Sequence, residues 1–207
     1  IANHGTYTKP IFFTRILDRN GKVLIENVPE TRQALKESTA FLLTDAMTDV
    51  MQSNVMYTRP GAGINATGSS AAIPGMTTAG KSGTTSDNND IWFVGYSPYY
   101  TAGIWGGCDN NQKLKDEHGS RNGGTSFAKR IWRKIMTRVH DGMSDPGFPM
   151  PDGIETAQVC RKSGKLAVPG VCSSDPRGNA VYTEYFAKGT APTEACDHHV
   201  RVTVCAV

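Results

Sequence analysis

The chain of 207 residues is long enough to bury the core of one domain of ordinary size, with room for a small appendage. Apolar residues make up 38% of it and charged residues 20%, a balance that excludes wholesale disorder. The formal net charge is +3, and the basic residues are scattered, so nucleic acid is not an expected partner. A run of about 18 apolar residues does not occur, so no membrane-spanning helix is expected in the sequence.

The first part of the chain predicts a hairpin and a helix. Two β-rich runs, 11–17 and 22–26, flank an Asn-Gly pair, which is the strongest short-range signal for a hairpin turn. Between residues 36 and 53, apolar side chains recur at steps of three and four residues and predict an amphipathic helix. The chain begins at Ile1, with neither an initiator Met nor the features of a signal peptide, and we expect it to be a fragment.

The middle of the chain predicts a small antiparallel sheet. Residues 60–76 are rich in Gly, Ala, Ser and Asn without periodicity, which favours a loop. Strand-like runs follow at 77–85, 91–96 and 99–106, and their short connections favour an antiparallel meander. The aromatic residues of these runs are expected mainly in the core or on the sheet face, although one of them could wall a substrate groove. They are Trp92, Phe93, Tyr96 and Trp105.

The last third of the chain predicts a second helix, a linker and a tail. Thr125 is a good N-cap for a helix that continues to Val139 with an apolar stripe along it. Residues 142–153 are rich in proline and turn-forming residues and are typical of a linker. We therefore divide the chain into a first part, 1–140, and a linker with a cysteine-bearing tail, 141–207.

Four of the five cysteines crowd the tail, namely Cys160, Cys172, Cys196 and Cys205. This clustering favours an oxidising compartment and a disulfide framework. Of the possible pairings we favour the sequential one, Cys160 with Cys172 and Cys196 with Cys205. Each bridge would close a short loop and contribute roughly 3 kcal/mol. A zinc site formed by residues 196–199 and another cysteine is the alternative, but it lacks a Cys-x-x-Cys pair, and we expect no metal.

Segment 80–85, with the sequence Gly-Lys-Ser-Gly-Thr-Thr, has the clearest chemical character. A strand of small residues, with glycine at position 83, allows the backbone of a ligand to approach closely. A peptide that ends in a carboxylate needs a cation and hydroxyl donors beside it, and Lys81, Ser82 and Thr84 supply both. Backbone N–H groups at such a strand edge can also stabilise an oxyanion.

The same segment matches a nucleotide-binding pattern. Residues 75–82 fit G-x-x-x-x-G-K-[ST], a loop that lies between a hydrophobic strand and a helix starting at the lysine. However, residues 69–74 do not read as a hydrophobic strand, and residues 83–89 are poor helix formers. A nucleotide-binding domain is therefore a remote alternative.

Lys81 and the three residues after it also resemble the K-T-G member of the motif set of penicillin-binding proteins and serine β-lactamases. The likeness extends over 79–85, 90–98 and 105–107, a combination that is similar to bifunctional class A penicillin-binding proteins. Further similarities, including 185–194, cover nearly the whole chain. The chain is identified as a member of that family and as the C-terminal part of its transpeptidase domain.

The resemblance implies an α+β fold, an antiparallel sheet of about five strands flanked by helices, which this chain would hold incompletely. In the family, the serine of an S-x-x-K motif attacks the penultimate D-Ala carbonyl of a peptidoglycan stem peptide, and a neighbouring amine resolves the acyl-enzyme. By this resemblance Lys81 and Thr84 are catalytic residues. Lys81 would assist proton transfer beside the S-x-N serine, and the Thr84 N–H would complete the oxyanion hole. Ser82, Gly83, Thr84 and Thr85 would bind substrate.

The family order places S-x-x-K and S-x-N before the lysine, so the nucleophile is expected upstream of this chain. Two literal matches inside the chain are not these motifs. Ser126 starts an S-x-x-K at the beginning of the second predicted helix, where a helix-capping role is expected. Ser86 starts an S-D-N, but it lies roughly 16 Å from Lys81 along an extended strand of ~3.3 Å per residue.

The resemblance also implies the partners and the location. Stem peptides and β-lactams are the expected ligands, the upstream part of the same protein is the expected partner, and no cofactor is expected. The protein would act on the extracytoplasmic face of a bacterial membrane, held by an N-terminal anchor outside this chain. By itself the chain is expected to be inactive. A noncatalytic fragment that only binds peptide or cell wall is the alternative.

Overall fold

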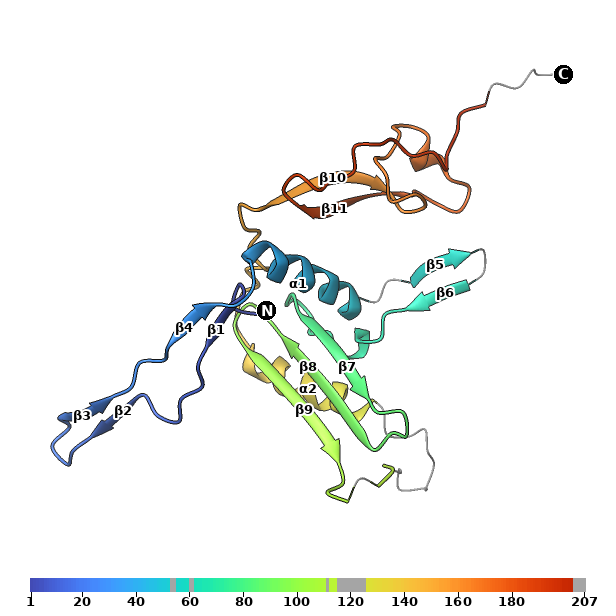
Figure 1. Cartoon of the computed structure of the whole chain (residues 1–207). Coiled ribbons are helices and arrows are strands. Elements are labelled where there is room, and N and C mark those ends of the chain that lie inside the picture. Colours follow the sequence, from blue (N-terminus) through green and yellow to red (C-terminus); the bar gives the residue numbers. More distant parts are fainter. Residues whose placement is uncertain (53–54, 60–61, 111, 115–125, 203–207) are drawn as a thin grey trace.

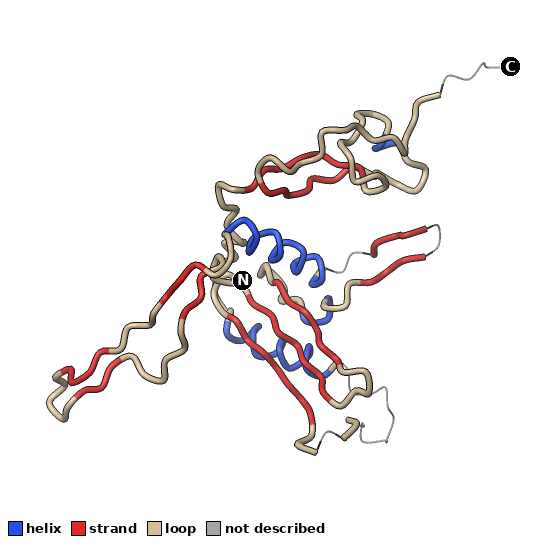
Figure 2. Tube along the Cα trace, viewed as in Figure 1, coloured by secondary structure: helices blue, strands red, loops and turns tan. Residues whose placement is uncertain are grey.

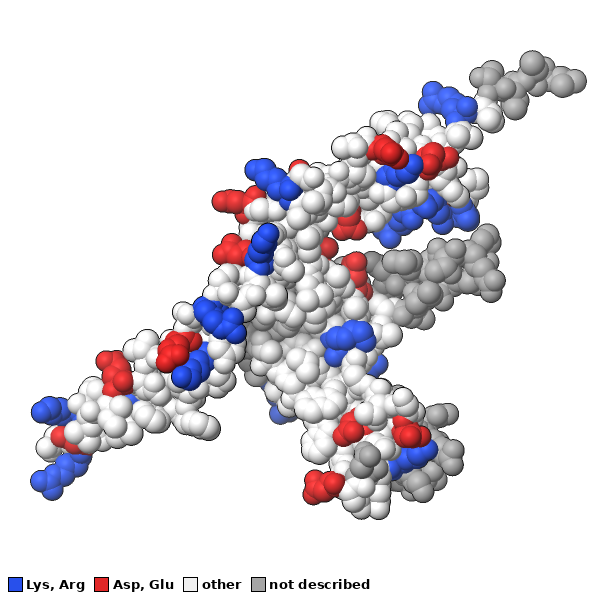
Figure 3. Space-filling view, viewed as in Figure 1, with Lys and Arg blue, Asp and Glu red and all other residues white. Residues whose placement is uncertain are grey.

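The structure is a computed structural model, and it describes residues 1–52, 55–59, 62–110, 112–114 and 126–202. Within these ranges the fold is α+β, as expected, with a central antiparallel sheet, two α-helices, hairpins and a β-rich unit at the C-terminal end (Figure 1). No helix in the described part is both long and apolar enough to cross a membrane. On the face shown in Figure 3, basic and acidic side chains are interspersed.

The central sheet is the predicted meander. Its strands are β7 (Ala79–Thr84), β8 (Asp90–Tyr96) and β9 (Thr101–Gly107), in the order β7-β8-β9 and antiparallel throughout. The family resemblance implies a sheet of about five strands that this chain holds incompletely. The described residues place three strands in this sheet, because the other strands of the chain pair with one another in separate two-stranded sheets.

The N-terminal residues form a long two-part arm that points away from the sheet (Figures 1 and 2). Its paired strands are β1 (Thr6–Thr8) with β4 (Thr31–Gln33), and β2 (Arg15–Leu17) with β3 (Val23–Glu26). The second pair is the predicted hairpin. Its turn is held by Asp18, whose Oδ1 accepts hydrogen bonds from the Asn20 and Lys22 N–H groups at 2.8 and 2.9 Å, and Gly21 takes the positive φ of 82°.

A second hairpin replaces part of the loop that we expected over residues 60–76. Strands β5 (Val55–Arg59) and β6 (Ala62–Asn65) pair there, followed by the short 3-10 helix η1 (Ser69–Ala71). The small and polar residues of 60–76 carry no alternating apolar pattern, so periodicity did not predict this hairpin.

Both predicted helices are present. Helix α1 (Glu37–Met51) packs against β7, and α2 (Phe127–Val139) packs against β8 and β9. The expected N-cap Thr125 lies outside the described residues, and Ser126 takes the cap position. One residue of the predicted apolar stripe of α1, Leu43, is 42% exposed, because the stripe is wider than the surface that the sheet covers.

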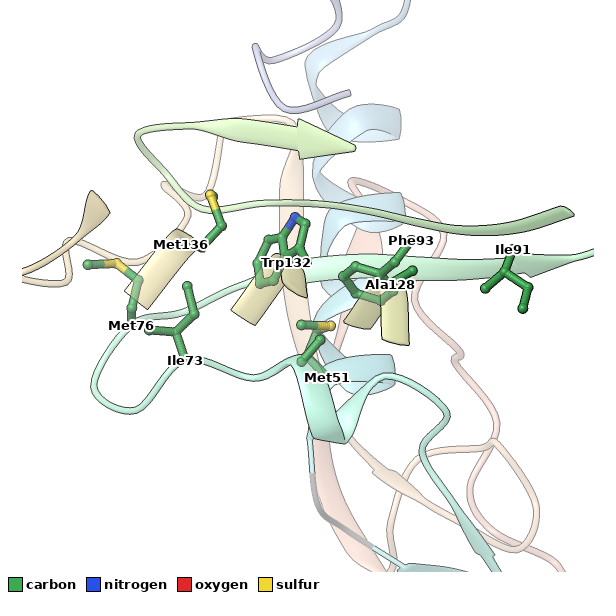
Figure 4. Packing of buried hydrophobic residues seen from close by; sticks show 9 residues of the cluster. Met51, Ile73, Met76, Ile91, Phe93, Ala128, Trp132 and Met136 are labelled. Carbon is green, nitrogen blue, oxygen red and sulfur yellow. The ribbon is translucent and has the colours of Figure 1, made fainter. Parts of the chain in front are cut away.

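The core lies where α1, α2 and the sheet meet (Figure 4). Its buried members are Met51, Ala71, Ile73, Met76, Ile91, Phe93, Ala128, Trp132 and Met136. The side chains of β8 alternate, so Ile91 and Phe93 face this core. Trp92 faces the other way and stacks at 6.1 Å on Trp105 of β9, leaving the two indoles 46% and 47% exposed. The four aromatic residues therefore divide, with Phe93 and Tyr96 buried and the two tryptophans on the sheet face.

The C-terminal unit contains β10 (Ile154–Cys160), the 3-10 helix η2 (Cys172–Ser174) and β11 (Val181–Ala187), with β10 and β11 antiparallel. It contacts α1 through an edge-to-face pair of Phe41 and Tyr185, whose ring centroids are 5.2 Å apart. The segment before it is anchored rather than free. Asp145 Oδ2 accepts hydrogen bonds from the Thr77 N–H and hydroxyl at 2.9 and 2.6 Å.

A buried polar group joins the end of α2 to the turn between β8 and β9. His140 Nδ1 lies 2.7 Å from the Met136 carbonyl oxygen, which can only accept, so Nδ1 carries the proton. The Ser97 hydroxyl then donates to His140 Nε2 at 2.7 Å, and its oxygen accepts from the N–H groups of Tyr99 and Tyr100 at 3.1 Å each. One hydroxyl therefore has three partners, of which the His140 imidazole is buried.

Ser97→Ala is expected to lower the free energy of unfolding by about 1–3 kcal/mol, because it leaves buried hydrogen-bonding groups without a partner. Ser144→Ala, at an exposed serine of the same junction, is the matched control and should change the stability by less than about 0.5 kcal/mol. Urea unfolding of the two variants measures the difference. Equal stabilities would show that the Ser97 hydroxyl does not hold this junction.

Candidate functional site

Strand β7 places the predicted site residues at the edge of the central sheet. Its first residues, Ala79 and Gly80, are buried beside α1, whereas the residues from Lys81 to Thr84 are half-buried or exposed. In the described part of the chain, β8 pairs with one side of β7 and no strand pairs with its other side. The half of β7 from Lys81 to Thr84 therefore presents a free backbone edge.

The register assigns each side chain to a face. Directly opposed residues share a face of the sheet, so Lys81 and Gly83 lie on the side of Val94 and Trp92. Ser82 and Thr84 lie on the other side, opposite Phe93 and Ile91, respectively. The cation and the two hydroxyls therefore flank the free edge from both faces.

The backbone of Thr84 is also directed to the free edge. The Thr85 N–H donates to the Asp90 carbonyl oxygen across the strand pair at 3.1 Å. Successive residues of a strand point their N–H groups to opposite sides, so the Thr84 N–H points away from β8. The ammonium of Lys81 lies along the same edge and donates to the Ser82 carbonyl oxygen at 3.0 Å, with its other protons available to a ligand.

Two glycines of β7 allow close approach. A Cβ at Gly80 would come within 2.8 Å of Phe93 Cζ and 3.2 Å of the Gly95 Cα, so the buried half of the strand has no room for a side chain. A Cβ at Gly83 would meet Trp92 Cβ at 3.3 Å. The absence of a side chain at Gly80 therefore lets β7 pack closely against the core. The absence of one at Gly83 leaves the strand surface beside Lys81 open to close approach.

Gly80→Ala is expected to lower the free energy of unfolding by about 1–3 kcal/mol, because the added methyl group overpacks the core against Phe93 and Gly95. Gly103→Ala in β9 is the matched control, since its Cβ would meet Val94 at 3.6 Å, an ordinary contact. Thermal unfolding of the two variants provides the comparison. If both variants lose the same stability, the close packing at Gly80 is not what holds β7 against the core.

Thr85, predicted to bind substrate, lies just past the end of β7 and has a role in the turn. Its hydroxyl oxygen accepts hydrogen bonds from the Asn89 and Asp90 N–H groups, each at 3.0 Å. The S-D-N match at 86–88 belongs to this turn, where Asp87 pairs with Lys113 at 2.8 Å. A role of Thr85 toward substrate stays a prediction.

The other two patterns that matched in sequence also have local structural roles. Ser126 precedes the first residue of α2, and Lys129 donates to the Thr67 carbonyl oxygen at 2.9 Å, so this S-x-x-K is part of helix packing. Lys81 lies inside a β-strand, whereas a P-loop lysine begins a helix. The nucleotide-binding alternative is therefore wrong.

The predicted disulfide between Cys160 and Cys172 stays a prediction. Both are free buried thiols, as is Cys196, and the three sulfurs lie together beside His199. The fold brings all three thiols to one point, within 4.8 Å of one another. Cys205 lies outside the described residues, so its pairing with Cys196 stays a prediction.

Sequence reasoning underrated one residue of this cluster and missed another. His199 was considered only within the zinc alternative, and Asp175, which contacts His199 Nε2 at 2.9 Å, was not considered at all. Hydrogen bonds from Arg177 and from His199 hold the pKa of Asp175 well below its usual range, so it is a carboxylate. The spacing Cys196-x-x-His199 was the available signal, because two intervening residues let both side chains reach one point.

Comparison with known proteins agrees with the family resemblance seen in the sequence. The family model described as "Penicillin binding protein transpeptidase domain" matches residues 1–137, and "Penicillin-binding protein 1A, C-terminal domain" matches residues 150–201. Penicillin-binding protein 1A of Clostridium tetani is 38% identical over 201 residues, which cover 97% of this chain and 23% of that protein. The chain thus spans about a quarter of this relative's length.

Solved structures show the same fold. Penicillin-binding protein 1A from Haemophilus influenzae matches with a TM-score of 0.69 at 19% identity, over 94% of this chain and 31% of that one. PonA1 from Mycobacterium tuberculosis, solved in complex with penicillin V, matches with a TM-score of 0.56 at 26% identity, over 72% of this chain and 38% of that one. With a Lys-Ser-Gly-Thr edge strand and a family model that covers well over half of its residues, the chain belongs to the penicillin-binding protein transpeptidase family.

Proposed function

We propose that this chain supplies the Lys-Ser-Gly-Thr edge strand of a peptidoglycan D,D-transpeptidase. The observation that carries the proposal is the free edge of β7, which carries an ammonium on one face, two hydroxyls on the other and the outward Thr84 N–H between them. A peptide laid along this edge would gain a strand-like partner, with its terminal carboxylate beside the hydroxyls of Ser82 and Thr84.

The reaction proposed at this edge is acyl transfer. A serine hydroxyl attacks the carbonyl carbon of the penultimate D-Ala, the C–N bond to the last D-Ala breaks, and the departing amine takes a proton. The Thr84 N–H would stabilise the oxyanion of the tetrahedral intermediate, and Lys81 would assist proton transfer at the neighbouring S-x-N serine. The amine of a second stem peptide then attacks the ester, which forms the cross-link and releases the serine.

The nucleophile is proposed to come from an upstream part of the same protein. The S-x-x-K match in the chain lies at the start of α2, where Ser126 takes the N-cap position. Ser126 is not part of β7. The sheet face that carries Lys81 also exposes an apolar patch of Trp92, Val94 and Trp105. If the rest of the protein packed against this face, it would bury this patch and bring the serine to the free edge of β7.

The same family relationship supports a location outside the cytoplasmic membrane of a bacterium. Peptidoglycan stem peptides and β-lactams are the proposed ligands, because both present an acyl group next to a carboxylate. The anchoring segment is proposed to be N-terminal to this chain.

Lys81→Ala is expected to slow acylation by a fluorescent penicillin about 10²- to 10⁴-fold in the full-length protein, because it removes a group that assists proton transfer. Thr84→Val, which keeps the backbone N–H but removes the hydroxyl, should slow it roughly 10- to 100-fold through the lost hydrogen bond to the carboxylate. Labelling rates read from gels after denaturation measure both effects.

Ser126→Ala is the control, and its labelling should equal that of the parent protein. Peptide mapping of the label should identify a serine N-terminal to residue 1. A label on Ser126, or unchanged labelling of Lys81→Ala, would contradict the proposal. Penicillin binding without a covalent label would favour the noncatalytic, peptide-binding alternative.

A further inference from the structure

The C-terminal unit brings four soft metal-ligating side chains together. Cys160 ends β10, Cys172 begins η2, and Cys196 and His199 lie in the segment after β11. Their three sulfurs and the imidazole nitrogen all lie within 4.8 Å of one another. The three cysteines are buried, and His199 is largely so. Free thiols from three distant segments therefore converge on one point inside the fold.

The orientation of His199 completes the cluster. Its Nε2 lies 2.9 Å from Asp175 Oδ2, and a carboxylate can only accept, so Nε2 donates there. Its Nδ1 is consequently the nitrogen that faces the sulfurs, at 3.3 Å from Cys160 and 3.5 Å from Cys196. A histidine that donates one nitrogen to a carboxylate and presents the other to a ligand cluster has the orientation of a metal-bound imidazole.

Backbone N–H groups donate hydrogen bonds to two of the sulfurs. The Lys162 N–H donates to Cys160 Sγ at 3.4 Å, and the Val168 N–H donates to Cys172 Sγ at 3.2 Å. Such hydrogen bonds favour the charged form of a thiol, which is the form that binds metal. The site therefore has an outer layer of donors as well as its four ligands.

Two sulfur-to-nitrogen distances in the cluster fit zinc. In a tetrahedral site with Zn–S bonds of about 2.3 Å and Zn–N bonds of about 2.0 Å, the ligand atoms lie about 3.5–3.8 Å apart. The two sulfur-to-Nδ1 distances of 3.3 and 3.5 Å are already near this value. Three thiolates and an imidazole select a borderline-soft cation and disfavour calcium or magnesium.

The unit also needs the stabilisation that a metal would provide. The core around the cluster consists of small side chains: Cys160, Cys172, Ala180 and Cys196, with Ala167, Val168 and Val181 packed against them. A β-rich unit of this size buries too little apolar surface to be stable by packing alone. Disulfide bonds are the other usual solution, but a bridge between two of these sulfurs would leave the third thiol and His199 facing it.

We propose that Cys160, Cys172, Cys196 and His199 form a structural zinc site, with Asp175 orienting His199. Four protein ligands close the coordination sphere, so the ion holds the C-terminal unit together and has no open position for catalysis. The site connects the end of β10, η2 and the segment after β11, and binding of the ion is coupled to folding of this unit.

Metal content of the full-length protein tests the proposal. The purified protein should contain one equivalent of zinc per chain, released when a mercurial reagent modifies the thiols. Cys172→Ser and His199→Ala should each lose most of the zinc, whereas Cys108→Ser, at a cysteine outside the cluster, should retain it. Zinc that is absent from the parent protein, or that stays bound in both ligand variants, would overturn the site.

Cobalt exchange provides a test that does not depend on variants that may unfold. The cobalt-loaded parent protein should show the sulfur-to-cobalt charge-transfer and intense visible bands of a tetrahedral thiolate site. A strong zinc chelator should lower the unfolding temperature of the C-terminal unit, and added zinc should restore it. Disulfide mapping of protein purified without reductant tests the alternative, in which these cysteines form disulfide bonds. A quantitative bridge between Cys160 and Cys172, or between Cys196 and Cys205, would refute the zinc site.

Discussion

The close contact of Gly80 with Gly95 is the constraint on which the rest of the first part depends. Any side chain at Gly80 would collide with Phe93, and one at Gly95 would come within 2.8 Å of Trp132 Cζ2. Because both positions lack a Cβ, β7 and β8 leave space for the large side chains of the core. Met51 of α1 can then reach the same core as Trp132, so two helices far apart in sequence pack on one sheet.

This packing also explains why the half of β7 from Lys81 onward is accessible to a ligand. The buried half of the strand is held by the core and by α1, whereas the half from Lys81 onward is paired along one side in the described structure. A rigid strand with a free edge holds its polar groups ready for a ligand with little loss of entropy on binding. The N–H groups of successive strand residues alternate in direction, and this alternation points the Thr84 N–H toward the free edge.

The C-terminal unit is stabilised differently from the rest of the chain. The first part has a core of large apolar side chains, whereas the unit has small side chains around three sulfurs. It contacts α1 through Phe41 and Tyr185, and in Figure 1 it lies on the side of α1 away from the central sheet. Its proposed metal site therefore serves the stability of the unit and leaves the edge strand independent of it.

The sequence by itself determined the local elements and the chemical nature of the edge strand. The Asn20-Gly21 turn, both helices, the meander and the Lys81 motif were predictable, because each depends on residues close together in the chain. Only the tertiary structure decided that Trp92 and Trp105 are exposed and that three distant cysteines meet at His199. These features depend on how strands and separate segments pack, and the short spacing of Cys196 and His199 could not show that Cys160 and Cys172 join them.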